Sequence, residues 1–230
     1  MSIAENLKLI QERIISAAQS SGRNPDSVKL VAVSKTQPAE AVKAAVEAGQ
    51  QTFGENYVQE FLDKAQQLPE SVEWHFIGSL QSNKVKYLAG LTRLIHSVDR
   101  LSLAREIDRQ WEKVGSPCEI LLQVNISGET TKSGTTTDDL FQLAREVALL
   151  PHLRVKGLMT MPPFFDEPER ARPYFRELKR LSELLAAEKI PGITMEELSM
   201  GMSGDFEVAI EEGATLVRVG SAIFGERYYR

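Results

Sequence analysis

A lysine ends a short apolar stretch near the start of the chain. Residues 31–35 read VAVSK, which is the composition of a buried strand followed by an amine. Removing an ammonium group from water is costly unless the group is paired or neutral. Lys35 therefore either extends along the surface to reach water, or it is an amine that a dry wall keeps neutral and able to attack a carbonyl carbon.

Two glycine- and serine-rich segments near the end of the chain could bind an anion. SMGMSG covers residues 199–204 and VGSAIFG covers residues 219–225. Glycines let backbone N–H groups approach a phosphate, and hydroxyl groups add further donors. The alternative is that both segments are ordinary turns between a strand and a helix, in which such residues are common. The residues that would contribute to an anion site are Ser199, Gly201, Ser203, Gly220 and Ser221.

Arg218 follows two apolar residues, so a buried position is expected for its side chain. A structural ion pair with Glu55 or Asp205 is one interpretation. The other is contact with a ligand, because a guanidinium keeps its proton and would leave a neighbouring pyridine nitrogen unprotonated. A ligand with both a carbonyl group and a phosphate would use Lys35 and the two glycine-rich segments together. Pyridoxal phosphate (PLP) is such a ligand.

The other candidate side chains have weaker indications. Asn56 is expected at the end of a strand, and His75 is interpreted as a hydrogen-bonded core histidine rather than a general base. Cys118 lies in an apolar run and is expected to be an inert core residue. The three histidines and one cysteine are scattered, so no metal-ligand cluster is predicted.

These residues need a scaffold that brings strand ends together. Apolar runs alternate with amphipathic segments along the chain, which indicates parallel strands joined by helices. Eight such units predict a single (β/α)8 TIM barrel, an α/β fold, over residues 1–230 with an extra helix at the N-terminus. An open doubly wound sheet is the alternative, but no G-x-G-x-x-G follows the first strand. The expected strands cover 28–35, 51–56, 72–79, 94–99, 118–127, 153–161, 194–201 and 215–225.

Composition limits the partners and the location. The 230-residue chain is 42% hydrophobic, which is enough apolar material for a core, and its net charge of −5 argues against nucleic acid. The N-terminal residues alternate apolar and charged types, unlike a signal peptide. No apolar run reaches the roughly 18 residues that a membrane span needs. A cytoplasmic protein without a membrane partner is expected. Within it, segment 127–137 (SGETTKSGTTT) is expected to be a mobile loop.

Six segments together resemble the YggS/PROSC family of pyridoxal phosphate homeostasis proteins, over about residues 1 to 225. They are VAVSKTQP, FGENYVQE, WHFIGSLQSNK, GLMTM, LSMGMSGDFEVAI and VRVGSAIFG. The resemblance implies a fold type III PLP protein, similar to the barrel domain of bacterial alanine racemase. It implies that Lys35 forms the internal aldimine with PLP and that Arg218 faces the pyridine nitrogen. It places Ser199, Gly201, Ser203, Gly220 and Ser221 in the phosphate-holding segments, with Asn56 and His75 near the ring or the lysine.

The resemblance also implies a function in PLP homeostasis, by binding and delivering PLP, with effects on amino-acid and keto-acid balance and no established catalysis. Racemisation in the alanine racemase class needs a second base, a tyrosine facing the cofactor from an additional C-terminal domain, and that domain is expected to be missing here. A monomer is therefore expected. Apo PLP enzymes or a regulatory protein are the candidate protein partners. Two other functions stay open: a PLP-dependent amino-acid racemase of low activity, and a cofactor-free Schiff-base aldolase.

Overall fold

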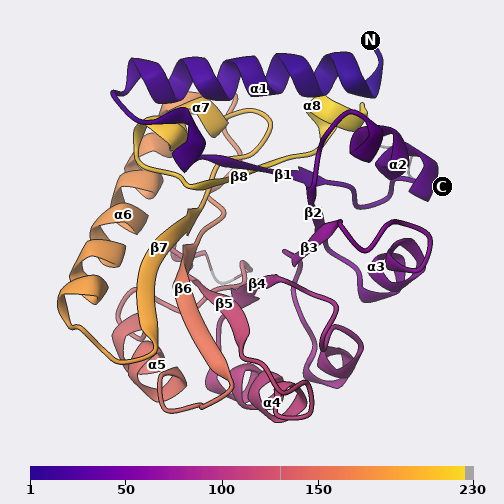
Figure 1. The fold of residues 1–230 in the computed structure, drawn as a ribbon. Coiled ribbons are helices and arrows are strands. Elements are labelled where there is room, and N and C mark those ends of the chain that lie inside the picture. The colour runs from indigo at the N-terminus through magenta and orange to yellow at the C-terminus, as the bar shows by residue number, and fades with distance from the viewer. Residues whose placement is uncertain (130, 226–230) are drawn as a thin grey trace.

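The strands form a closed parallel barrel surrounded by helices (Figure 1). The computed structural model describes residues 1–129 and 131–225. Position 130 of the expected loop and the last five positions of the expected domain therefore lie outside the described residues. The strands are β1 (Lys29–Val33), β2 (Thr52–Glu55), β3 (Glu73–Phe76), β4 (Leu94–Val98), β5 (Cys118–Gln123), β6 (Leu153–Met159), β7 (Ile193–Ser199) and β8 (Leu216–Val219). Neighbours in the chain pair in parallel and β8 pairs with β1, which confirms the predicted eight-stranded barrel.

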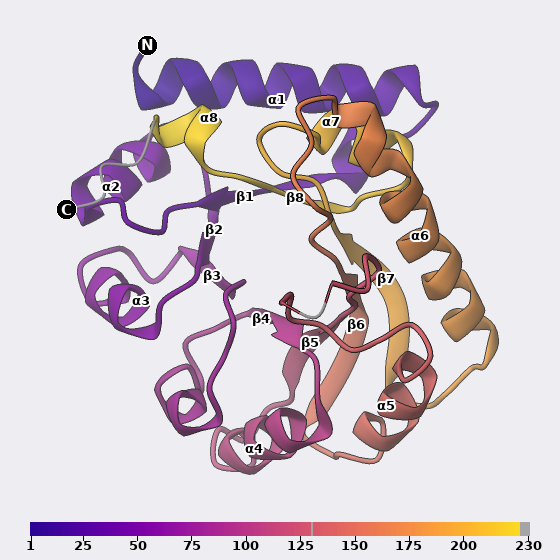
Figure 2. The same ribbon diagram turned by 180° about the vertical axis from the view of Figure 1, so that it is seen from behind.

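Helices connect the strands on the outside of the ring, as Figures 1 and 2 show from opposite sides. They are α1 (Ile3–Ser20), α2 (Ala39–Glu47), α3 (Val58–Ala65), α4 (Leu101–Trp111), α5 (Leu140–Val147), α6 (Arg172–Ala187), α7 (Phe206–Glu211) and α8 (Ser221–Phe224). Short 3₁₀ helices are η1 (Pro25–Ser27), η2 (Ser82–Tyr87) and η3 (Pro168–Ala171). None of the helices in this part of the chain has both the length and the apolar character of a membrane span.

One crossover differs from the helix expected between the third and fourth strands. The segment is the 3₁₀ helix η2, in which the Leu88 amide donates to the Val85 carbonyl three residues earlier. Only the eleven residues 79–89 lie between Gly78 and Gly90, and the connection uses 3₁₀ geometry, which is frequent in short connectors.

The extra N-terminal helix α1 forms as predicted and lies across α7 and α8 (Figure 1). Its start is fixed by a capping box, in which Ser2 and Glu5 each accept a hydrogen bond from the other's backbone N–H. Its buried face includes Leu7, Ile10 and Ile14, and these apolar residues lie about one helical turn apart. This helix therefore covers helices of the last two barrel units, where the glycine-rich segments lie.

Side chains alternate between the inside and the outside of the barrel along each strand. In β8, Val217 and Val219 join the large core between strands and helices, whereas Leu216 belongs to a separate small cluster inside the ring. Arg218, two residues after Leu216, must also point inward. The inner cluster consists of Val31, Leu94, Leu121, Met159 and Leu216. By the same alternation His75, His96 and Ser199 face inward, so part of the barrel interior is polar.

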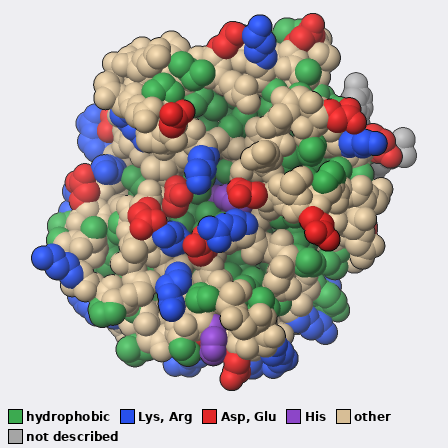
Figure 3. Space-filling model, viewed as in Figure 1, with side chains coloured by type: hydrophobic (Ala, Val, Ile, Leu, Met, Phe, Trp, Pro, Cys, Tyr) green, Lys and Arg blue, Asp and Glu red, His purple; other side chains and the backbone are tan. Residues whose placement is uncertain are grey.

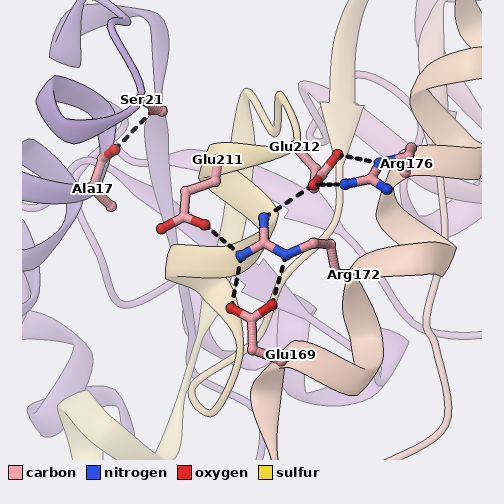
Figure 4. Close-up of polar contacts among 7 residues, drawn as sticks. All are labelled: Ala17, Ser21, Glu169, Arg172, Arg176, Glu211 and Glu212. Atoms are coloured by element: carbon pink, nitrogen blue, oxygen red, sulfur yellow. Dashed lines mark hydrogen bonds and ion pairs between the residues drawn. The ribbon is translucent and has the colours of Figure 1, made fainter.

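Ion pairs lie at the starts of two strands and around the beginning of α6. Side chains of both signs gather near the middle of the face in Figure 3. At the starts of strands, Arg93 lies 3.1 Å from Glu119. Figure 4 shows a second group, in which Arg172 at the start of α6 is bonded to Glu169, Glu211 and Glu212. These contacts hold the beginning of α6 to the end of α7.

The pairing of β6 with β7 depends on a glycine. The register of β6 shifts at Gly157 against both neighbouring strands, and a Cβ there would overlap the carbonyl oxygen of Glu197. We expect Gly157→Ala to lower the free energy of unfolding by at least about 3 kcal/mol, because backbone rather than a flexible side chain would have to move. Urea unfolding measures this change. Gly204→Ala is the control, since a Cβ at Gly204 meets nothing within 4 Å. Equal stabilities of the two variants would contradict the prediction.

Candidate ligand site at the mouth of the barrel

A cavity of about 890 Å³ opens where the strands end. Its wall brings together residues that are far apart in the sequence, from β1 and β8 themselves and from the segments after β1, β2, β3, β6, β7 and β8. The predicted site residues that line it are Lys35, Asn56, Ser203, Arg218, Gly220 and Ser221. The other three predicted residues, His75, Ser199 and Gly201, are buried in or next to the barrel wall.

Lys35 does not end the strand as expected but lies in the turn that follows it. Strand β1 stops at Val33, and Thr36 has a φ of 63°, a left-handed conformation that is unfavourable for a β-branched residue. The Thr36 amide donates to a Glu60 carboxylate oxygen at 2.7 Å, which stabilises this turn. The turn directs the chain away from the strand at the position of Lys35, whose side chain is half-buried.

A buried ion pair fixes the other side of Lys35. The Lys64 ammonium donates to the Ser34 carbonyl at 2.7 Å and to Glu55 at 2.6 Å, and it contacts Glu60 at 3.3 Å. The Ser34 hydroxyl donates to the same Glu55 oxygen at 2.6 Å. Residues 34 and 36 are thus both anchored to α3 and the end of β2. Sequence reasoning missed Lys64 and Glu60, because a lysine and a glutamate on an amphipathic helix give no local sign of burial.

Asn56 has an orphaned polar atom beside the cavity. Its buried Oδ1 has no hydrogen-bond partner among the described residues, although buried side-chain amides are normally satisfied. Because the oxygen and nitrogen of an amide are assigned from their partners, this position can present either a donor or an acceptor. The backbone of Asn56 packs directly against Gly78, where any Cβ would overlap it. The backbone of Asn56 is therefore fixed beside the cavity, and its side chain offers a polar group to a ligand.

The two glycine-rich segments meet at the part of the cavity wall next to the end of β1. The Gly220 amide donates to the Ser203 hydroxyl at 3.2 Å, which joins the turn after β7 to the turn after β8. A Cβ at Gly220 would lie 3.1 Å from the Val33 carbonyl oxygen, so this backbone approaches the end of β1 closely. Gly201 has a φ of 89° and packs against α7. The result is a shallow cradle of backbone and hydroxyl groups near Lys35.

Arg218 reaches the cavity from inside the barrel. Its guanidinium donates to the Ser199 hydroxyl at 2.5 Å and to the Thr160 carbonyl at 2.9 Å. Within residues 1–129 and 131–225 the structure records no ion pair at Arg218, and Glu55 pairs with Lys64 instead. Burial lowers the pKa of Arg218 to about 10, while the nearby Asp205 charge opposes this shift. The side chain thus stays cationic at neutral pH and is bonded to neutral acceptors.

The two histidines inside the barrel are hydrogen-bonded core residues. His75 Nδ1 lies 2.9 Å from His96 Nε2, and His96 Nδ1 lies 2.8 Å from the Ser199 hydroxyl. Burial, with the charges of Lys29 and Arg93, lowers the pKa of His75 to about 3. Burial also lowers the pKa of His96 well below its usual range. Both imidazoles are therefore neutral near pH 7, and neither lines the cavity.

Apolar side chains from the segment after β6 complete the wall. Phe164 is 83% exposed and Met161 is 43% exposed, whereas Phe165 packs against Tyr174. Asp205 also lines the cavity, and burial raises the pKa of its carboxyl group. The cavity is therefore amphipathic, with a lysine and an arginine on one side of an apolar wall.

The fold resembles that of a known class of barrel protein. Residues 2–228 match the family described as "Alanine racemase, N-terminal domain". Alanine racemase from Corynebacterium glutamicum superposes with a TM-score of 0.70 over 96% of this chain and 62% of that chain, at 17% identity, a likeness of fold alone. The chain is thus a barrel of the fold type III PLP class.

Two further comparisons are more specific. The pyridoxal phosphate homeostasis protein of Aquifex aeolicus is 47% identical over 230 residues, which is 100% of both chains. PipY from Synechococcus elongatus, whose structure was determined with PLP bound, is 35% identical with a TM-score of 0.83 and covers 97% of this chain and 100% of that chain. The chain belongs to the pyridoxal phosphate homeostasis protein family.

The ion pair behind Lys35 gives a stability prediction. We expect Lys64→Met to lower the free energy of unfolding by about 3 kcal/mol near pH 7, because Glu55 would be left buried and charged without its partner. The double variant Lys64→Met/Glu55→Gln should recover most of this loss. Urea unfolding of both variants measures the difference, and a double variant no more stable than Lys64→Met would contradict it.

The same variant should show a defined pH dependence. Burial raises the pKa of the Glu55 carboxyl, although Lys64 opposes the shift. A group whose pKa is raised by folding stabilises the folded state at pH values below its unfolded pKa. This contribution is lost as the pH rises through the pKa of the folded state. Removing Lys64 removes the opposing charge and raises the pKa further. The stability deficit of Lys64→Met should therefore be smaller near about pH 5 than near about pH 8.

Proposed function

We propose that this chain binds PLP reversibly in the cavity at the barrel mouth and contributes to PLP homeostasis by holding the cofactor and releasing it. The observation that carries this proposal is the placement of Lys35, Arg218 and the Ser203–Gly220 cradle around one cavity. Membership of the family and the PLP-bound structure of PipY support it.

The residues fit the chemical groups of PLP. Lys35 would hold the aldehyde: its neutral amine adds to the carbonyl carbon and one water molecule leaves, which is reversible by hydrolysis. The Ser203–Gly220 cradle with Ser221 would bind the phosphate through hydroxyl and backbone N–H groups. Asn56, whose buried Oδ1 position lacks a partner, would bond to a polar atom of the ring. Ser199, Gly201 and His75 would act from behind the wall by fixing these groups.

Arg218 would face the pyridine nitrogen. Bound PLP supplies an electrophilic aldehyde conjugated to its ring, and a protonated ring nitrogen would make that ring a strong electron sink. A guanidinium keeps its own proton and so leaves the nitrogen unprotonated. Arg218 would therefore orient the ring and limit its reactivity.

We further propose that the protein holds PLP without turning over amino acids. The titratable side chains among the described residues that line the cavity are Lys35, Asp205 and Arg218. Neither a tyrosine nor a histidine is in that set, and its one carboxyl group, that of Asp205, already accepts a hydrogen bond from the Met202 amide at 2.6 Å. The described wall therefore provides no tyrosine of the kind that racemisation needs. Apo forms of PLP enzymes are the proposed recipients of the cofactor.

The assignment of Lys35 can be tested by trapping. We expect purified protein incubated with PLP to gain a visible absorbance band, and borohydride followed by peptide mapping to place the reduced adduct on Lys35. Lys35→Ala should lose both signals, whereas Lys43→Ala, at an exposed lysine on α2, should keep them. An adduct of unchanged yield in Lys35→Ala would refute the assignment.

The absence of turnover can be tested separately. In deuterated water, protein loaded with PLP should exchange the α-proton of alanine far more slowly than about 1 s⁻¹, the low end of ordinary enzyme turnover. Proton NMR of the amino acid follows the exchange, with Lys35→Ala as the blank. Exchange near ordinary enzyme rates would favour a racemase. A protein that binds no PLP but is trapped by borohydride with a sugar phosphate would favour an aldolase.

A further inference from the structure

Four polar side chains form one continuous hydrogen-bonded line across the interior of the barrel. It runs from Arg218 on β8 through Ser199 on β7 and His96 on β4 to His75 on β3. The three links measure 2.5, 2.8 and 2.9 Å. Each of the four side chains is at most 5% exposed. Polar groups at this depth are expensive to bury, so their arrangement should satisfy every donor and acceptor.

That requirement fixes where the protons lie. Ser199 accepts a hydrogen bond from the Arg218 guanidinium, so its own proton needs an acceptor, and His96 Nδ1 is the acceptor within reach. His96 is neutral and must then carry its proton on Nε2, which donates to His75 Nδ1. The opposite arrangement makes Ser199 accept twice and leaves its proton without an acceptor among the described residues. The line is therefore directed from Arg218 toward His75.

The direction of the line matters because no carboxylate pairs with Arg218 among the described residues. A buried arginine is usually held by a carboxylate, yet its two hydrogen bonds in this part of the chain go to the Ser199 hydroxyl and the Thr160 carbonyl. A hydroxyl can rotate, so by itself it would hold the guanidinium loosely. A hydroxyl that must donate to a fixed imidazole has one orientation, and its lone pairs then face Arg218.

We propose that His96 is a positioning residue for the PLP site, which acts through Ser199 to fix the Arg218 guanidinium at the cavity wall. This inference rests on the proposed function, because it assigns Arg218 to the ring nitrogen of PLP. His75 completes the line by accepting the His96 proton. No group of three potential metal ligands occurs among the described residues.

The proton arrangement can be read directly without any cofactor. Long-range proton–nitrogen NMR correlations of ¹⁵N-labelled apo protein distinguish the two neutral tautomers of each histidine. We expect His96 and His75 both to carry the proton on Nε2 at pH 7. His152 is the third histidine of the chain, and His152→Asn serves to assign its signals. A proton on Nδ1 of His96 would overturn the directed line.

Matched substitutions test the effect on binding. The Oδ1 atom of an asparagine at position 96 can occupy the place of His96 Nδ1 and accept the Ser199 proton, whereas a leucine of similar size cannot. We expect His96→Leu to weaken PLP binding about tenfold, the low end of the loss for one hydrogen bond to a charged group. His96→Asn should recover most of this affinity. His152→Asn should bind like the wild type.

A double-substitution cycle separates positioning from general stability. Because His96 acts through Ser199, the effects of His96→Leu and Ser199→Ala on the PLP dissociation constant should not add, and the double variant should lose about tenfold rather than about a hundredfold. Thermal unfolding of the same variants without PLP measures how far each substitution lowers the stability of the fold. Additive losses, or a lower melting temperature with unchanged PLP affinity, would overturn the proposal.

Failure of this inference is distinguishable from failure of the proposed function. If the wild type forms no adduct with PLP at Lys35, the proposed function fails, while the tautomers measured by NMR still decide the proton arrangement. If the adduct forms and His96→Leu binds PLP as tightly as His96→Asn, the PLP function stands and the positioning role of His96 is wrong.

Discussion

The candidate site depends on one pairing, that of β1 with β8. This ladder places Val31 opposite Arg218 and Ala32 opposite Val219, so the first and last strands of the chain lie side by side. Lys35 follows one of these strands and Gly220 follows the other, and the two turns pack so closely that a Cβ at Gly220 would touch the end of β1. If the ring were open at this seam, the amine and the cradle would separate. Closure of the barrel is therefore what creates the cavity, and the helices around it serve mainly to bury the outer faces of the strands.

The same closure sets which side chains meet inside. Successive residues of a strand point to opposite faces, so a slip of one residue in β8 would move Arg218 into the outer core and Val217 or Val219 into the barrel. The line from Arg218 to His75 links four strands, of which β4 and β7 are not neighbours in the sheet. Such a contact exists only across the interior of a closed ring. The polar line and the apolar inner cluster thus both lie inside the barrel. The register of the strands determines which side chains of each kind point inward.

Much of this arrangement could be predicted from the sequence, and the rest could not, for identifiable reasons. Alternating strand and helix patterns predicted the barrel, and residues near strand ends, such as Lys35, Asn56 and Gly220, were correctly expected at one mouth, because parallel strands share their direction. His96 was not among the candidate site residues, since nothing local shows that it faces Ser199 more than one hundred positions away. Lys64 was missed because a lysine on an amphipathic helix gives no local sign that it will be buried against Glu55. Local patterns define elements, whereas these contacts are defined by closure and register.

The parts of the site are held in place by contacts within the protein. The turn that carries Lys35 is anchored on both sides by Glu60 and Lys64, and the cradle is joined by the bond from Gly220 to Ser203. Arg218 is held by two neutral acceptors, and the charge of the nearby Asp205 partly offsets its own. Because these internal contacts fix the turn, the cradle and the guanidinium, little conformational order has to be gained when a ligand binds or lost when it leaves. That property suits a protein proposed to take up and release a reactive aldehyde more than it suits one that must reorganise around a reacting substrate.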